Sequence, residues 1–192
     1  TTRAGLTAQQ QSNITGAVAN PPWAPPSAIP SIGVEDSIDA AAISAWAARL
    51  ESLGTAYPAG TVASTPLGTQ AAPKIITVDG SGTLPGDPAF TLQATSGAGV
   101  LIVKNGKLRL SGNTQWVGLI VLVGENASIE MFGGGDKALY GSVVVRETVN
   151  PASLIATGGG NFKVRYSCDG LSTANKAESG ALRGRKLWWH EL

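Results

Sequence analysis

Three short apolar segments recur along the middle of the chain, and each opens on a glycine. They span residues 99–106, 118–124 and 141–146. β-Branched residues and leucine follow each glycine, which is typical of a buried strand. A second kind of segment, with strict alternation of polar and apolar residues, follows each apolar one, at 107–112, 128–133 and 153–158. This alternation predicts strands with one face toward a core and the other toward solvent.

The spacing of the repeat predicts a stack of parallel strands. Gly118 follows Gly99 by 19 residues, and Gly141 follows Gly118 by 23. Periods of this length with several short strands are typical of a β-solenoid, in which each coil of chain turns at glycines and pairs with the next coil. We therefore expect a mainly β fold, a right-handed parallel β-helix. The alternative is an antiparallel sandwich, which also has short strands but does not by itself repeat like segments in like order.

Residues 36–53 carry the one helical pattern. Apolar residues at helical spacing form one face, namely Ile38, Ala42, Trp46, Leu50 and Leu53. Asp36 can cap the start, and Gly54 is a natural stop. We expect this helix to pack on the β body or to cap one of its ends. Asp36 and Asp39 could instead be metal ligands, but two carboxylates at a helix start are usually caps.

These patterns divide the chain into three parts. Residues 1–33 are expected to form an irregular proline-rich arm, because the prolines between positions 21 and 30 forbid a continuous helix. Residues 34–54 contain the helix. Residues 55–192 form the β-solenoid domain, which ends in a polar and basic C-terminal tail. The pair Trp188-Trp189 in this tail is expected to pack back onto the fold, or else to form an exposed contact for a partner.

Composition and charge limit the classes of function that the chain can have. Hydrophobic residues make up 43% of the chain and charged residues 14%, so we expect a folded chain with a sparsely charged surface. Lys and Arg number 14 and Asp and Glu 13, which gives no electrostatic reason to expect nucleic acid as a partner. No apolar run approaches the roughly 18 residues that a membrane-spanning helix needs. The chain starts Thr-Thr-Arg, so we interpret it as a processed or trimmed form.

Candidate chemical groups are few and scattered. Cys168 is the only cysteine and His190 the only histidine. We expect Cys168 to be a partly buried small side chain rather than a nucleophile. The acids of the repeat region are Asp79, Asp87, Glu125, Glu130, Asp136 and Asp169. Glu130 is expected to point outward from its strand, and no acid is expected to pair with a charged neighbour at repeat spacing. The prediction is therefore no catalytic residue, no cofactor and no metal site.

Three other functions receive little support from the pattern. The glycine-rich stretches at 133–137 and 158–161 lack the Gly-Lys-Ser/Thr of a phosphate-binding loop. A face that binds ice or crystalline polysaccharide needs an aligned ladder of threonines or aromatic residues. The candidate threonines, Thr77, Thr91, Thr114 and Thr157, are not expected to align. A polymerising β-helix would need an uncapped end, and the predicted helix argues against one.

The order of these motifs resembles the soluble region of bacterial PilX-type type IV pilus assembly proteins over roughly residues 36–192. The resemblance rests on the segments Lys74–Gly80, 98–112, Trp116–Gly124, Phe132–Gly135, Leu139–Val145, Gly158–Gly160, Arg165–Asp169 and Trp189–Leu192. It implies an exported protein at the cell surface, on the pilus or in the periplasm, with other pilus or envelope proteins as partners. Members normally carry a hydrophobic N-terminal segment, their membrane attachment, before the soluble part; we expect this segment to lie upstream and to be removed here by truncation or processing. The resemblance implies no catalytic residues.

The expected function is a non-enzymatic structural or adhesive module of the bacterial cell envelope, associated with type IV pili. The alternative is a carbohydrate-binding or carbohydrate-active β-helix protein, with surface polysaccharide as its partner. That alternative rests on a fold-level analogy, because many parallel β-helices act on polysaccharides.

Overall fold

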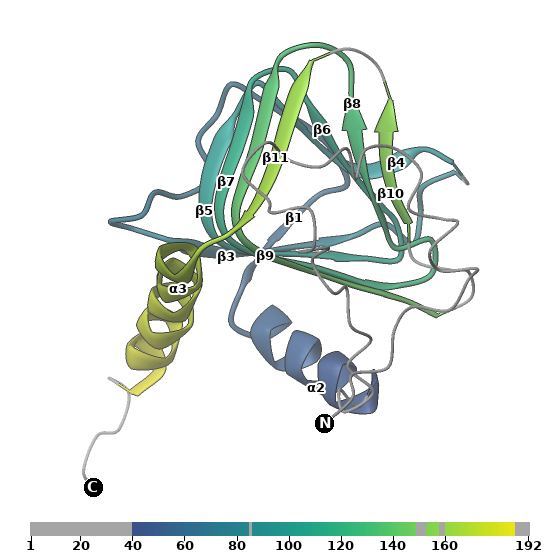
Figure 1. Cartoon of the computed structure of the whole chain (residues 1–192). Coiled ribbons are helices and arrows are strands. Elements are labelled where there is room, and N and C mark those ends of the chain that lie inside the picture. The colour runs from purple at the N-terminus through teal and green to yellow at the C-terminus, as the bar shows by residue number, and fades with distance from the viewer. Residues whose placement is uncertain (1–39, 85, 149–152, 158–159, 187–192) are drawn as a thin grey trace, which may run out of the picture. The chain divides into compact units, whose positions relative to one another are not determined.

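The strands stack in two parallel sheets (Figure 1). The computed structural model describes residues 40–84, 86–148, 153–157 and 160–186. One sheet has six strands, in the order β1 (Thr55–Tyr57), β3 (Lys74–Asp79), β5 (Ser96–Lys104), β7 (Thr114–Gly124), β9 (Asp136–Glu147) and β11 (Asn161–Tyr166). The other has five, in the order β10 (Ser153–Thr157), β8 (Ser128–Phe132), β6 (Lys107–Ser111), β4 (Pro88–Gln93) and β2 (Gly60–Ala63).

Every strand pairs in parallel with the equivalent strand of the neighbouring coil. Consecutive strands of the chain alternate between the two sheets, so each coil contributes one strand to each sheet. This arrangement is a β-solenoid, as the repeat predicts, and it excludes the antiparallel sandwich. The predicted arm at residues 1–33 lies outside the described residues.

The glycines that define the repeat lie in one column. Gly99 is opposite Gly118, and Gly118 is opposite Gly141, on β5, β7 and β9. All three have a positive φ, between 121° and 140°. The alternating series is also in register, since Ser111 pairs with Phe132 and Phe132 with Thr157. The repeat read from the sequence is therefore the physical period of the stack.

The core lies between the two sheets. Alternate side chains of both sheets point inward and form one buried apolar cluster, which includes Phe90, Leu101, Leu110, Trp116 and Ile120. Each of these five side chains is at most 1% exposed. Because the strands pair in register, like positions of successive coils stack on one another and the core runs continuously along the solenoid.

Two helices cover the outer face of the six-stranded sheet. They are α2 (Ala40–Glu51) and α3 (Cys168–Lys186). Leu50 of α2 and Ala177 of α3 pack with the outward residues Ile102 and Val121 in a second buried cluster. The predicted N-terminal helix is therefore present over its described part and packs on the β body. Its capping residues, Asp36 and Asp39, lie outside the described residues.

The C-terminal tail is wrongly predicted, because most of it forms α3, the longer helix (Figure 1). The Ser167 hydroxyl caps this helix by accepting a hydrogen bond from the Gly170 N–H at 3.2 Å. At Gly170 the helix approaches the sheet so closely that a Cβ would lie 2.3 Å from the Tyr140 carbonyl oxygen.

Neither described helix has the length and apolar content that crossing a bilayer requires.

Candidate functional site

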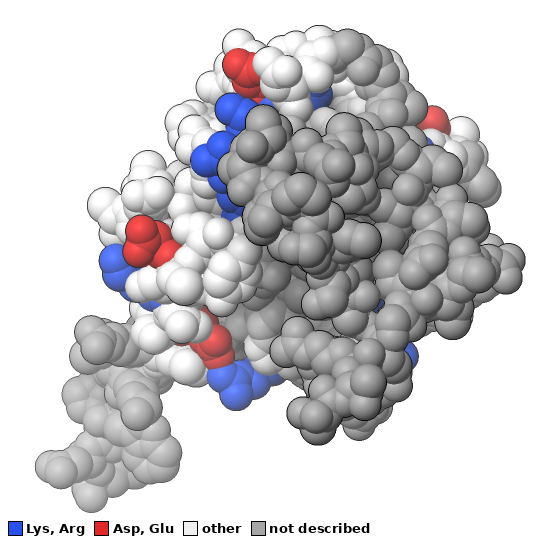
Figure 2. Space-filling model, viewed as in Figure 1, with Lys and Arg blue, Asp and Glu red and all other residues white. Residues whose placement is uncertain are grey.

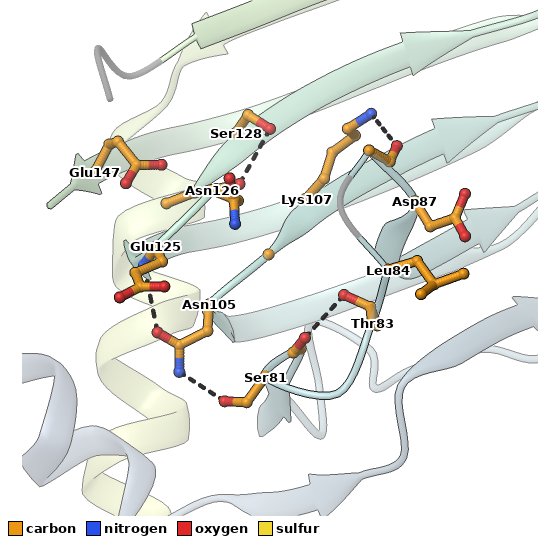
Figure 3. Close-up of a pocket in the computed structure, with 14 residues that line it drawn as sticks. Ser81, Thr83, Leu84, Asp87, Asn105, Lys107, Glu125, Asn126, Ser128 and Glu147 are labelled. Atoms are coloured by element: carbon orange, nitrogen blue, oxygen red, sulfur yellow. Dashed lines mark hydrogen bonds between the residues drawn. The ribbon is translucent and has the colours of Figure 1, made fainter. Parts of the chain in front are cut away.

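A polar hollow of about 420 Å³ lies at the corner where strands of the six-stranded sheet lead into the five-stranded one (Figure 3). The connection after β3 is long, whereas those after β5 and β7 are short turns. The long connection forms one wall of the hollow, and the short turns of the next coils form its floor. Its polar groups include Ser81, Thr83, Asp87, Asn105, Lys107 and Glu125.

Asn105 ties three successive coils together beside the hollow. Its side-chain N–H groups donate to Asp79 Oδ1 at 3.2 Å and to Ser81 Oγ at 3.0 Å, both on the preceding coil. Its Oδ1 accepts from the Glu125 backbone N–H of the following coil at 3.3 Å. Asn105 has a φ of 50°, a left-handed conformation that asparagine tolerates better than most residues. The Asn-Gly dipeptide predicts this turn, but its bonds to neighbouring coils follow only from the stacking.

The carboxylate of Asp79 is held in its charged form. The Ser81 hydroxyl donates to Oδ1 at 2.5 Å, and this bond is the main cause that lowers the pKa of Asp79. Partial burial opposes the shift, while the Ser81 backbone N–H, Asn105 and the charge of Lys104 add to it. A carboxyl group with a lowered pKa is ionised at neutral pH, so Asp79 accepts hydrogen bonds and is poorly suited to donate a proton.

A hydrogen bond from Lys107 links the connection between β3 and β4 to the next coil. Its ammonium donates to the Gly86 carbonyl oxygen at 2.8 Å (Figure 3). The same Nζ lies 3.6 Å from Glu130 Oε2, on the outer face of the five-stranded sheet. Lys107 therefore links the wall of the hollow to a second group of charges.

This second group contradicts the prediction that no acid pairs with a charged neighbour at repeat spacing. Arg109 Nε donates to Glu130 Oε2 at 2.8 Å, and the two residues are register partners on β6 and β8. The Arg109 guanidinium also lies over the Phe132 ring, 4.7 Å from its centroid. Glu130 is on the outward face, as expected, but these partners leave it only 7% exposed. The pair spans 21 residues, which is one period of the alternating series.

Glu130 gives the fold a testable dependence on pH. Burial tends to raise the pKa of Glu130, but the Arg109 hydrogen bond and the charges of Lys107 and Arg109 outweigh burial and lower it. A lowered pKa means that ionised Glu130 stabilises the fold above about pH 4.5, its ordinary value. This stabilisation is lost as the pH falls through the lower pKa of the folded protein.

We therefore expect Glu130→Gln to lower the free energy of unfolding by about 2 kcal/mol at neutral pH. The difference from the unmodified chain should shrink on acidification from roughly pH 5 to pH 3. Urea unfolding across this range measures both effects. Glu125→Gln is the matched control, because Glu125 is exposed and should change stability by less than about 0.5 kcal/mol. An equal loss at every pH would contradict the assigned role of the charge.

The glycine-rich turn at 133–135 holds a cation of its own. Lys137 Nζ donates to the carbonyl oxygens of Gly133, Gly134 and Gly135 at 2.7, 2.9 and 3.2 Å. Lys137 is 3% exposed, so these bonds satisfy a buried charge. The turn directs carbonyl oxygens inward, whereas a phosphate-binding loop presents backbone N–H groups to its ligand.

The four remaining acids are divided among the hollow, the start of β9 and the first turn of α3. Asp136 accepts from Asn161 at 3.0 Å, and its backbone N–H donates to Asn113 Oδ1 at 2.9 Å, so these three residues link successive coils at the start of β9. Asp169 lies in the first turn of α3. Of the six acids, Asp87 and Glu125 line the hollow, and Asp79 lies beside it.

Cys168 is exposed, so the expected partial burial is wrong; it is the first residue of α3. The four candidate threonines do not form a ladder, because none is the register partner of another. Their partners are Ala56 and Ile102 for Thr77, Thr61 and Arg109 for Thr91, Lys137 for Thr114 and Phe132 for Thr157. His190 and Trp188-Trp189 lie outside the described residues. Over the described ranges, no three His, Cys, Asp or Glu side chains are placed to share a metal ion.

Comparison with protein-family models, with curated proteins and with solved structures returns no match. The resemblance to PilX-type proteins therefore stays a prediction.

Proposed function

We propose that this chain is a non-enzymatic structural or adhesive module of the bacterial cell envelope, associated with type IV pili. The observation that carries the proposal is the use of polar side chains to join coils. Asn105 connects Asp79 on one coil to Glu125 on another, and Arg109 and Glu130 pair across two coils. Hydrogen bonds and ion pairs between coils make the stack rigid. A protein that presents a surface under mechanical load requires such rigidity.

The ionised state of Asp79 and Glu130 supports the non-enzymatic part of the proposal. Asp79 and Glu130 both have a lowered pKa, and both accept hydrogen bonds from side chains of neighbouring coils. A general acid at neutral pH needs a raised pKa instead. These carboxylates are therefore suited to hold the stack together rather than to transfer protons.

The pilus association rests on the resemblance of the strand and glycine motifs, and it can be tested in the bacterium that encodes the chain. We expect the protein in pili sheared from the cell surface, and we expect deletion of its gene to reduce the number of pili or the attachment of cells. Complementation with the Gly82→Ala variant, at an open position of a connection, should restore the phenotype. Absence from the sheared fraction together with normal piliation and attachment would exclude this association.

Carbohydrate binding in the hollow is the second candidate. The hydroxyls of Ser81 and Thr83 and the carboxylates of Asp87 and Glu125 line one concave surface, and such groups hydrogen-bond sugar hydroxyls. Isothermal titration with surface polysaccharide from the same bacterium tests this candidate. Binding that Asp87→Asn and Glu125→Gln abolish would favour it, and no heat of binding would count against it.

A further inference from the structure

The last strand of the six-stranded sheet ends the stack without a described neighbour. One edge of β11 pairs with β9, from Asn161 opposite Asp136 to Tyr166 opposite Gly141. Within the residues that the structure describes, no strand pairs with its other edge. Both described helices pack on the face of the sheet rather than over this edge. An open strand edge presents a row of backbone N–H and C=O groups that another strand can bind.

The inward row of β11 continues the core, but its side chains are largely exposed. Phe162, Val164 and Tyr166 are register partners of the inward residues Lys137, Leu139 and Gly141 of β9. Leu139 is 3% exposed, whereas Val164 is 49% exposed. Phe162 and Tyr166 are 46% and 73% exposed. One further strand would bury these side chains as β9 buries those of β7.

The outward row of β11 is basic. Lys163 and Arg165 alternate with the apolar residues and are exposed. No acidic side chain among the described residues forms an ion pair with either of them. Basic side chains gather on the region of the molecule that β11 occupies (Figures 1 and 2). The edge thus has an apolar row and a positive row, and a strand that pairs with it meets both.

We infer that β11 binds an extended segment of another protein, in which apolar residues alternate with Asp or Glu. The backbone of this segment would extend the sheet by one strand of about six residues, the length of β11. Its apolar residues would cover Val164 and its neighbours, and its carboxylates would face Lys163 and Arg165. The inference does not depend on the association with pili, since it follows from the edge alone.

Charge argues against a second copy of the chain as the occupant. Two β11 edges paired with each other would bring the rows of Lys163 and Arg165 together, and like charges across neighbouring strands are destabilising. The strand at the opposite end of the sheet, β1, has only three residues, Thr55–Tyr57, and no acid. It would leave half of β11 unpaired and both cations without a partner.

The test uses two fluorescent seven-residue probes on the full chain, one alternating Glu with Val and the other Lys with Val. We expect fluorescence anisotropy to show that the acidic probe binds at least about tenfold more tightly than the basic one, and that added salt weakens its binding. Lys163→Glu combined with Arg165→Glu should reverse this preference. Lys176→Glu, a charge reversal at an exposed site on α3, should leave it unchanged.

Three results would overturn the inference. They are equal binding of both probes, no binding of either, and an acidic preference that survives the double charge reversal. Sedimentation of the chain alone supplies a further check, because concentration-dependent dimers that Val164→Asp disrupts would assign the edge to a second copy. Circular dichroism establishes that each variant is folded. If the double variant does not fold, the comparison of the two probes and their salt dependence on the unmodified chain still decides the outcome.

Discussion

Replacing Gly118 by alanine should lower the free energy of unfolding by roughly 3–5 kcal/mol. A Cβ at this position would lie 2.0 Å from the Gly99 carbonyl oxygen, closer than any real contact. The residue also has a φ of 138°, which L side chains rarely adopt. Because the clash is with the backbone of the preceding coil, no side-chain movement can relieve it. Chemical denaturation followed by circular dichroism measures the loss.

Gly82→Ala is the matched control for this substitution. No atom lies within 4 Å of the Cβ that alanine would place at Gly82, and this residue has no positive φ. The Gly82→Ala substitution should change the free energy of unfolding by less than about 0.5 kcal/mol. If Gly118→Ala proved as harmless as the control, the register of β5 with β7 would have to differ from the one described.

Val121→Asp should have a similarly large effect for a different reason. Val121 is 0% exposed and packs between the six-stranded sheet and the two helices. An ionised carboxylate there would lose its hydration without gaining a partner, so we expect a loss of more than about 4 kcal/mol and an unfolded chain at neutral pH. Thermal unfolding and the yield of soluble protein both report this loss.

Val164→Asp is the control for Val121→Asp, because it introduces the same charge on a strand of the same sheet. Val164 is 49% exposed, so its substitution should cost less than about 1 kcal/mol. Comparison of the two variants separates the effect of burial on stability from the effect of strand propensity. Equal losses at both positions would mean that strand propensity, rather than the covering helices, makes Val121 sensitive.

The strand stack could be predicted because its signal is local and repeated. Gly99, Gly118 and Gly141 recur at nearly constant spacing, and parallel coils turn such a spacing into a column. The Arg109–Glu130 pair could have been predicted in the same way, since its spacing of 21 residues equals that from Ser111 to Phe132. Only the alignment of successive coils places Arg109 opposite Glu130, because the two residues are far apart along the chain.

The helix α3 could not be predicted from propensity, because its sequence contains Gly170 and Gly180 and is rich in small polar residues. Gly170 is required by the close approach of the helix to Tyr140, which is a tertiary contact. The hollow was also beyond prediction. Its wall depends on the path of the connection after β3, and Lys107 fixes this path through the Gly86 carbonyl oxygen.

The position of α3 has a consequence for how the molecule comes apart. Strands of a solenoid touch only adjacent coils, so such stacks tend to lose structure one coil at a time from their ends. Here α3 lies across β3, β5, β7 and β9, and an Arg49–Glu178 ion pair joins it to α2. Coils that do not touch each other are thereby coupled through a common element. The stack should accordingly melt in a single cooperative transition, with fraying limited to the terminal strands.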